Sequence, residues 1–238
     1  MDWLGLDVQL LLGTAVTIGV VHTLIGPDHY LPFIAIARER GWSLRRTLAI
    51  TAGCGVGHCL ASVVLGVIGI AFGLALAALE FFQETRGNAA AWLLLGFGLA
   101  YATWSRRRRR RGETHTHRHA HRDGTVHTHA HAHGTDDEHL HVHAQAGARP
   151  LVVALLVIFL LGPCEALIPL LMYPAAKANV LAVVAVAVVF SLATVATMLA
   201  CVAVGLKGAN GLRIPHSVSG VATGAIISVC AIAMLVGL

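Results

Sequence analysis

The stretch HTLIGPDHYLP, from His22 to Pro32, lies inside the long apolar run Val8–Ala37. It places two histidines, an aspartate and two prolines among residues that are otherwise apolar. Proline has no backbone N–H and interrupts the hydrogen bonds of a helix, so Gly26-Pro27 predicts a break. A helix that breaks in an apolar medium needs partners for the backbone groups it releases. The stretch is therefore the first candidate site in the chain.

The composition predicts an all-α integral membrane protein. The chain of 238 residues is 56% hydrophobic and 12% charged, whereas soluble domains are about 45–50% apolar and about 25% charged. A bilayer core takes about 20 residues per helix, and the apolar runs fit six transmembrane helices. These runs are Val8–Ala37, Leu48–Leu79, Ala89–Trp104, Leu151–Ala175, Val180–Leu206 and Ser217–Leu238.

The basic residues predict the orientation of these helices. With six crossings, 15 of the 17 Lys and Arg residues fall in loops one, three and five. The positive-inside rule then places those loops in the cytoplasm and both termini outside. The N-terminal MDWLGLD lacks the positive region of a signal peptide. We expect a multi-pass protein of a bacterial-type inner (plasma) membrane, with the lipid bilayer as partner and no nucleic-acid role. The oligomeric state stays open.

A second phrase, LGPCEALIPL, returns at residues 161–170. Both phrases open with Gly-Pro, continue with two ionisable or metal-binding side chains and reach a further proline within two helical turns. They divide the chain into three-helix repeats at 1–104 and 151–238, flanking a loop at 105–150. Three crossings per repeat would invert the second repeat, and inverted repeats with matching broken helices are typical of transport sites near the membrane midplane. The alternative is that chance Gly-Pro pairs only kink two helices. The predicted break residues are Gly26, Pro27, Gly162 and Pro163.

Ionisable side chains at apolar depth cost about 2.5–3.5 kcal/mol each, so they should face one another, water or a cation. His22 and His29 would stand about 10.5 Å apart along an unbroken helix, and a break would let both approach one ion. It would also free carbonyls such as that of Gly26. His58 could complete the site from the next helix, or it could be a buried histidine bonded to a carbonyl. The candidate metal ligands are His22, Asp28, His29, His58, Cys164 and Glu165.

The loop between the arginine run and Pro150 holds 11 of the 15 histidines, mostly as His-x-His. Such composition is typical of metal-binding tracts, and the glycine, threonine and acidic residues around it predict disorder without metal. Imidazole with carboxylate favours nickel, cobalt, zinc or copper over magnesium or calcium. The predicted loop ligands are His115, His117, His119, His121, His127, His129, His131, His133, His139, His141 and His143.

His22, Asp28-His29 and Gly57-His58 resemble the signature of the nickel/cobalt transporter superfamily, including its NicO-type, nickel/cobalt-efflux and membrane urease-accessory branches. Members carry a histidine with Asp-His in an early span, Gly-His in the next and, in efflux members, a histidine-rich loop. The resemblance implies metal ligation by His22, Asp28, His29 and His58. The transported cation would be Ni²⁺ or Co²⁺, with Zn²⁺ possible, and the cytoplasmic loop favours efflux. Five residues separate His22 from Asp28, whereas the uptake branch usually has four.

Three other classes stay open. The Gly162–Cys164 phrase also resembles thiol-redox and sulfite-exporter-like membrane proteins, which gives two of them. A transmembrane thiol-redox carrier needs a cysteine from each half, with the two Cα atoms within about 7 Å. A sulfite or organic-anion exporter needs an arginine or a half-helix N-terminus at the site, and no arginine is expected at membrane depth. A membrane sensor or store of metal would use the loop alone. No ATP-binding GxxxxGK[ST] motif is present, and no catalytic residue or prosthetic group is expected, so the prediction is a transporter and not an enzyme.

Overall fold

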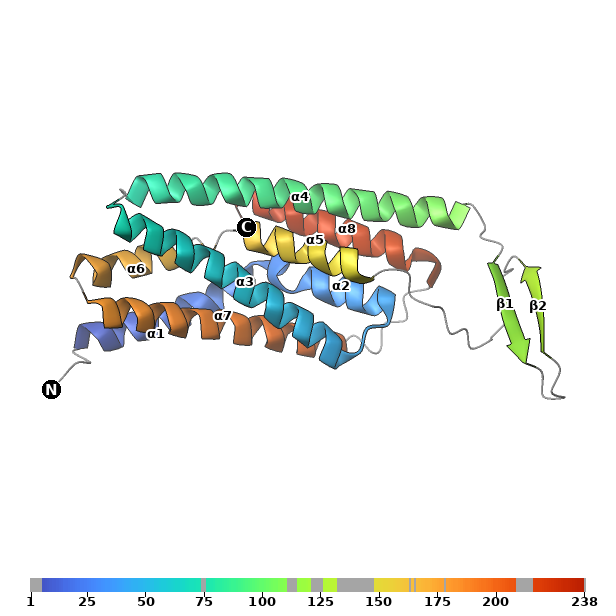
Figure 1. The fold of residues 1–238 in the computed structure, drawn as a ribbon, viewed down its shortest axis with the longest axis horizontal. Coiled ribbons are helices and arrows are strands. Elements are labelled where there is room, and N and C mark those ends of the chain that lie inside the picture. The colour runs from blue at the N-terminus through green and yellow to red at the C-terminus, as the bar shows by residue number, and fades with distance from the viewer. Residues whose placement is uncertain are drawn as a thin grey trace.

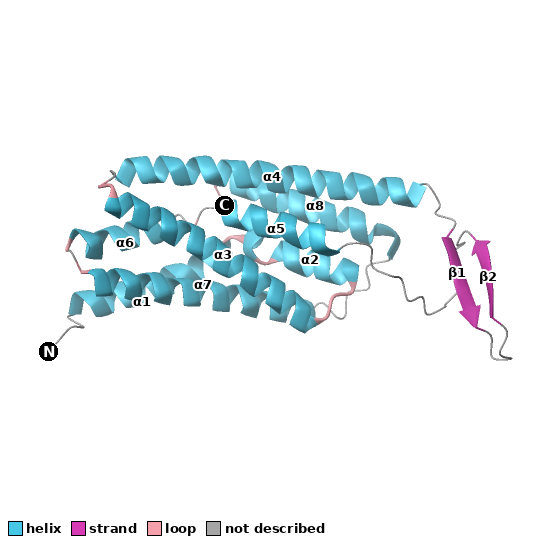
Figure 2. Cartoon of the chain, in the orientation of Figure 1, coloured by secondary structure: helices cyan, strands magenta, loops and turns pink. Residues whose placement is uncertain are grey.

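The computed structural model describes residues 6–73, 76–110, 115–120, 126–131, 148–162, 164, 166–177, 179–208 and 216–237. Its body is all-helical, as the composition predicts, and one two-stranded ribbon lies beyond the C-terminal end of the longest helix (Figures 1 and 2). The helices are α1 (Leu6–Ile25), the 3₁₀ turn η1 (Pro27–His29), α2 (Leu31–Arg40), α3 (Leu44–Ala71), α4 (Leu76–Arg110), α5 (Ala148–Leu161), α6 (Leu167–Ala176), α7 (Val180–Gly208) and α8 (His216–Leu235).

Among the described residues, three helices are long and apolar enough to cross a membrane: Asp7–Ile25, Leu44–Ala71 and Val180–Gly208. Three further apolar helices are shorter, at Pro150–Leu161, Leu167–Ala176 and Gly220–Leu235. The outer surface of the bundle carries large apolar side chains, such as Val204 with 69% of its surface exposed. Exposed apolar surface on this scale is unusual for a soluble monomer, and it fits a protein whose solvent is lipid.

The chain passes back and forth along the long axis of the bundle (Figure 1). α1, η1 and α2 follow one another in one direction, whereas α5 and α6 follow one another in the opposite direction. α1 packs along α7, α4 packs along α8, and α3 packs against both α7 and α5. Helices from the N-terminal part of the chain are thus paired with helices from its C-terminal part.

Two of these passages are interrupted at the Gly-Pro phrases. α1 ends at Ile25, Gly26 adopts an extended conformation (φ −80°, ψ 95°), and α2 starts only at Leu31. In the second phrase α5 ends at Leu161 and α6 starts at Leu167. Gly162, Cys164 and Ala166 of the second break are described, whereas Pro163 and Glu165 lie outside the described residues.

The second and third helices differ from their predicted bounds. The second apolar run was expected to reach Leu79, but α3 ends at Ala71 and Gly73 turns the chain with a φ of +61°. Leu79 lies on α4, which extends well beyond the predicted Ala89–Trp104 and past residue 104, where the first repeat was expected to end. Hydropathy marks only the apolar middle of α4, because Glu, Gln and Arg are good helix formers and continue the helix in both directions.

α4 and α8 approach each other through glycine. A Cβ at Gly98 would lie 2.8 Å from the carbonyl oxygen of Gly224, and a Cβ at Gly224 would lie 2.6 Å from the amide nitrogen of Ala102. Only glycine lets the two backbones pack this closely. Small residues at such spacing are the usual means of helix association in membranes, where no hydrophobic effect draws helices together.

The histidine-rich loop contains two described strands, β1 (His115–Ala120) and β2 (Val126–His131), which pair antiparallel. The sequence predicts disorder without metal in this loop, so the ribbon differs from the prediction. The reason is that His alternates with Thr, Ala and Val, which gives the two-residue period of a strand. The register sets His115 opposite His131, His117 opposite His129 and His119 opposite His127. The remaining loop histidines, His121, His133, His139, His141 and His143, lie outside the described residues.

Candidate metal centre

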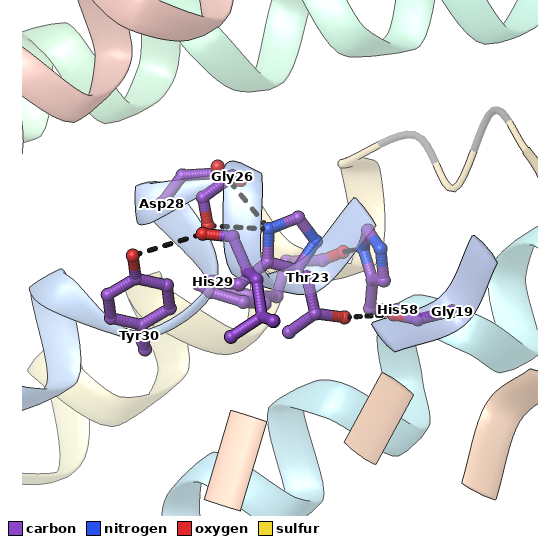
Figure 3. Close-up of polar contacts among 9 residues, drawn as sticks. Gly19, Thr23, Gly26, Asp28, His29, Tyr30 and His58 are labelled. Atoms are coloured by element: carbon purple, nitrogen blue, oxygen red, sulfur yellow. Dashed lines mark hydrogen bonds and ion pairs between the residues drawn. The ribbon is translucent and has the colours of Figure 1, made fainter. Parts of the chain in front are cut away.

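Three of the predicted ligands meet at the first helix break. His22 comes from the last turn of α1, His29 from η1 and His58 from the middle of α3. One ligand atom from each ring can be chosen so that all lie within 4.8 Å of one another. Figure 3 shows His29 at the break beside Gly26 and Asp28, with His58 close by. His29 and His58 are each only 3% exposed.

The break brings His22 and His29 together. Their ring centroids are 4.8 Å apart, whereas seven residues of unbroken helix would separate them by about 10.5 Å along the axis. His29 also lies edge-on to His58, with ring centroids 5.3 Å apart. Gly26-Pro27 therefore does more than kink the helix, because it folds the second histidine back toward the first.

The hydrogen bonds of His29 and His58 define which ring nitrogen can accept a metal. His29 Nδ1 lies 3.1 Å from the Gly26 carbonyl oxygen, and His58 Nδ1 lies 3.2 Å from the Phe159 carbonyl oxygen. A carbonyl oxygen only accepts, so each Nδ1 carries the hydrogen and donates it. In a neutral imidazole the other nitrogen then has a lone pair. A backbone carbonyl on the far nitrogen is the usual outer partner of a metal-binding histidine.

The Nε2 atoms of His22, His29 and His58 are all buried and have no hydrogen-bond partner among the described residues. Leaving one buried polar atom unpaired costs about 1–3 kcal/mol, and three such atoms in one cluster call for an explanation. Around one ion, bonds of about 2.0–2.1 Å would hold the three nitrogens roughly 3.5 Å apart. The ring nitrogens that lie nearest one another, one from each histidine, are within 4.8 Å, so the rings would need to approach by roughly 1 Å to complete such a site.

Asp28 lies behind His29 and not among the three converging nitrogens. Its Oδ1 is 3.3 Å from His29 Nδ1, so the carboxylate and the Gly26 carbonyl share the same donor. The sequence predicts Asp28 as a direct ligand, and the structure shows it holding the ring of a candidate ligand. The Gly26 carbonyl, expected to be freed by the break, is already bonded to the backbone N–H of His29 at 3.1 Å as well as to Nδ1.

The second break reaches the same centre through His58. Phe159, the acceptor for His58, lies on α5 close to its end, and a Cβ at Gly162 would lie 3.3 Å from His58 Nδ1. A Cβ at Gly26 would lie 2.6 Å from His29 Nδ1. The glycines of both Gly-Pro phrases therefore lie against a histidine of the cluster, and neither position has room for a larger side chain without movement.

Side chains of α4 satisfy the backbone of the second break. Arg86 donates from one guanidinium nitrogen to the carbonyl oxygens of Leu160 at 3.0 Å and Gly162 at 3.4 Å. Gln83, which is 2% exposed, donates to the carbonyl oxygen of Cys164 at 3.4 Å. Arg86 was not among the predicted site residues, so it is a residue that sequence reasoning missed. Its position 74 residues before Leu160 gave no signal for the contact.

Cys164, predicted as a ligand from the second half, lies fully buried. Its backbone N–H donates to Ser62 Oγ on α3 at 3.2 Å. All five cysteines are thiols in the structure. Glu165, the other candidate from this phrase, lies outside the described residues.

Comparison with known protein families, with curated protein sequences and with solved structures finds no match. The chemistry of the centre is therefore argued from its own residues. Three clustered imidazoles, in their neutral form, can bind a cation of the Co²⁺, Ni²⁺, Cu²⁺ or Zn²⁺ type, and they offer little to Mg²⁺ or Ca²⁺, which prefer oxygen ligands.

Proposed function

We propose that this protein transports a divalent transition-metal cation across a membrane, most favourably Ni²⁺ or Co²⁺, in the direction of efflux. The observation that carries the proposal is the convergence of three histidines at the break of an apolar helix. Each of them has a buried Nε2 atom without a hydrogen-bond partner among the described residues. Membrane transporters bind their cargo at discontinuous helices because the unwound segment presents polar groups within the bilayer. The resemblance to the nickel/cobalt transporter superfamily agrees with this assignment.

The proposal includes six crossings in two inverted repeats. α4, with 35 residues, spans about 52 Å at 1.5 Å per residue, and α8, with 20 residues, spans about 30 Å, the thickness of a bilayer core. α5 and α6, placed end to end across their break, would make another crossing. The opposite directions of α1–α2 and α5–α6 in Figure 1 support the inversion, as do the equivalent positions of Gly26 and Gly162 against the histidines.

The histidine-rich loop would collect metal on the cytoplasmic side, where the concentration of basic residues places it. Opposite residues of an antiparallel ladder lie close enough for their side chains to interact. The register of β1 and β2 would therefore provide His-His pairs for several ions. A loop that holds metal on the cytoplasmic side would supply an exporter, which is the reason for proposing efflux.

An anion exporter is less well supported by the same centre. The three buried Nε2 atoms have no partner among the described residues, and their lone pairs would repel an anion. Arg86 already donates to two carbonyl oxygens of the second break. A thiol-redox carrier draws support from the position of Cys164, whose backbone N–H donates to Ser62 on α3, the helix that also carries Cys59. It leaves the three unpaired nitrogens without a role, and for that reason metal transport is preferred.

Flux measured in proteoliposomes tests the proposal. Purified protein is reconstituted, Ni²⁺, Co²⁺ and Zn²⁺ are offered separately, and a metal-sensitive dye inside the vesicles reports entry. Wild type is compared with His29→Ala and with Ser228→Ala, a matched change of a buried side chain that bonds to its own helix at Gly224. Flux of one ion that disappears in His29→Ala and persists in Ser228→Ala supports the proposal. Absence of flux for all three ions, with all proteins folded, refutes it and favours the thiol or anion classes.

A further inference from the structure

A groove of about 620 Å³ lies between α3 and α5. α3 contributes five lining residues from Arg46 to Cys54, and α5 contributes three from Val152 to Leu156. The α3 residues recur every three or four positions, so they form one face of that helix. Val153 and Leu156 are 57% and 40% exposed, so the groove opens to the medium around the bundle. Its volume is within the range of about 300–1,000 Å³ that ligand sites occupy.

The charge of the groove lies at one end. Among the described residues that line it, Arg46 is charged and the others are apolar, since a buried cysteine such as Cys54 behaves as a small hydrophobe. Arg46 lies in the first turn of α3, where Ser43 caps the helix by accepting from the Arg46 backbone N–H. The Arg46 Cζ lies 4.8 Å from the centroid of the Trp42 ring. Tryptophan and arginine are both typical of the boundary between hydrocarbon and water.

The length of the groove fits one leaflet of a bilayer. Arg46 and Cys54 are eight residues apart in α3, which corresponds to about 12 Å along the helix axis. Half of the hydrocarbon core of a bilayer is about 15 Å thick. α3 is long and apolar enough to cross a membrane, and the groove begins at its first turn. The groove therefore has the length of an acyl chain in one leaflet, with Arg46 at the level of the headgroups.

The charge around Arg46 favours an anionic headgroup. Arg38, Arg40 and Arg45 lie with it where α2 turns into α3, and Glu39 is the one acidic residue between positions 38 and 46. Basic residues clustered beside a membrane span attract anionic lipids. A free anion would match this charge but would not cover the apolar walls, and a purely apolar ligand would not match the charge. A molecule with an anionic head and a hydrocarbon chain matches both parts.

We propose that this groove binds an anionic phospholipid of the surrounding bilayer, with an acyl chain between α3 and α5 and the phosphate at Arg46. The groove ends one helical turn before the metal centre, because Cys54 precedes His58 by four residues and Leu156 precedes Phe159 by three. The acyl chain would pack against the two helices that the bond from His58 to Phe159 joins. The site stands apart from the proposed function, because lipid binding requires no metal.

Native mass spectrometry of the delipidated full-length protein in detergent tests the site, with phosphatidylglycerol and phosphatidylcholine as probes. We expect wild type to bind phosphatidylglycerol in preference to phosphatidylcholine. Arg46→Gln should lower phosphatidylglycerol binding about fivefold, the factor that one basic residue near an anionic headgroup contributes. Arg45→Gln changes an exposed arginine that does not line the groove, so it should keep the wild-type preference. An equal loss in both variants, or no loss in Arg46→Gln, overturns the site.

Gly53→Leu tests the apolar part of the groove. A Cβ at Gly53 would meet nothing within 4 Å, so the new side chain can enter the groove without displacing its walls. We expect this variant to bind less of both lipids. Gly13→Leu, where a Cβ also meets nothing within 4 Å, should bind them as wild type does. Unchanged binding in Gly53→Leu overturns the site. A dimer that Gly53→Leu dissociates and lipid leaves intact would assign the groove to a second copy of the chain and also overturn the proposal.

A measurement on wild type alone removes any dependence on the folding of variants. Phosphatidylglycerol with a diazirine in its acyl chain is photocrosslinked to the protein in vesicles, and peptide mass spectrometry locates the labelled residues. We expect stronger labelling of Ile50 and Val153 in the groove than of Val204 on α7, which is more exposed than either. Labelling of Val204 as strong as that of the groove overturns the site. No metal is present in these measurements, so failure of this site and failure of the proposed transport are distinguishable.

Discussion

His58 Nδ1 donates to the carbonyl oxygen of Phe159 at 3.2 Å, a bond between residues 101 positions apart. It joins a candidate ligand ring of the first half to the end of α5, just before the second helix break. The bond sets the tautomer that leaves Nε2 available, and it makes the geometry of the centre depend on the second break. Substitutions in either Gly-Pro phrase are therefore expected to change metal affinity or metal flux.

Removal of one ligand ring should have the largest effect. Loss of an outer partner of a metal ligand lowers metal affinity or activity by about 10–100-fold. We expect His58→Ala to lower metal flux by more than this, because only two of the three ligand rings would remain. Initial rates in proteoliposomes, with Ser228→Ala beside it, measure this. A rate for His58→Ala within about twofold of wild type would exclude His58 from the site.

Asp28→Asn distinguishes an outer partner from a ligand. The carboxylate contacts His29 Nδ1 at 3.3 Å, and the amide side chain that replaces it keeps an oxygen acceptor while it removes the charge. We expect a loss of about 10–100-fold in apparent metal affinity, as for other changes to the outer partners of metal ligands, with transport retained at high metal concentration. The concentration dependence of flux measures it. A variant as inactive as His58→Ala would mean that Asp28 binds the ion directly.

Gly26→Ala tests the close approach at the first break. The new Cβ would lie 2.6 Å from His29 Nδ1 and 2.9 Å from Asp28 Oδ1, so the ring must leave its position. We expect flux to fall at least about tenfold, the lower end for a displaced partner of a ligand. Gly13→Ala is the matched control on α1, since nothing lies within 4 Å of a Cβ there. Equal loss in both variants would show a general effect of alanine and contradict the specific contact.

The sequence predicts more of the first helix break than of the second. Proline at position 27 has no N–H to donate, so the first break and the approach of His22 to His29 follow from local chemistry. The contacts of the second break are tertiary. Neither the bond from Arg86 to Leu160 nor the bond from the Cys164 backbone to Ser62 has a local signal, because each contact joins segments far apart in the chain. The length of α4 was also missed, since hydropathy does not register the helix-forming polar residues at its ends.

Arg86→Gln tests the support of the second break. Its guanidinium donates to the carbonyl oxygens of Leu160 and Gly162, and each acceptor left unpaired costs about 1–3 kcal/mol. Arg86 is partly exposed, so water can replace some of the loss and the lower part of that range is expected. Thermal unfolding in detergent measures the change, with the exposed Arg45→Gln as control. Equal midpoints for the two variants would mean that water satisfies these carbonyls without Arg86.

Deletion of residues 114–143 tests the role of the loop. This removes β1 and β2 together with the cross-strand histidine pairs. We expect flux to continue with a weaker apparent affinity for metal, because under the proposed function the loop would only gather ions and the buried histidines would pass them across. The apparent affinity is measured from the dependence of flux on the metal concentration at the cytoplasmic side. Complete loss of flux would make the loop part of the pathway.

X-ray absorption spectroscopy of the loop-deleted chain loaded with one equivalent of Co²⁺ tests the central claim most directly. The account predicts three imidazole nitrogens at about 2.0–2.1 Å from the metal, from His22, His29 and His58, and loss of one of them in His58→Ala on the same background. A first shell made of water and carboxylate oxygens, or a spectrum that His58→Ala leaves unchanged, would contradict the account.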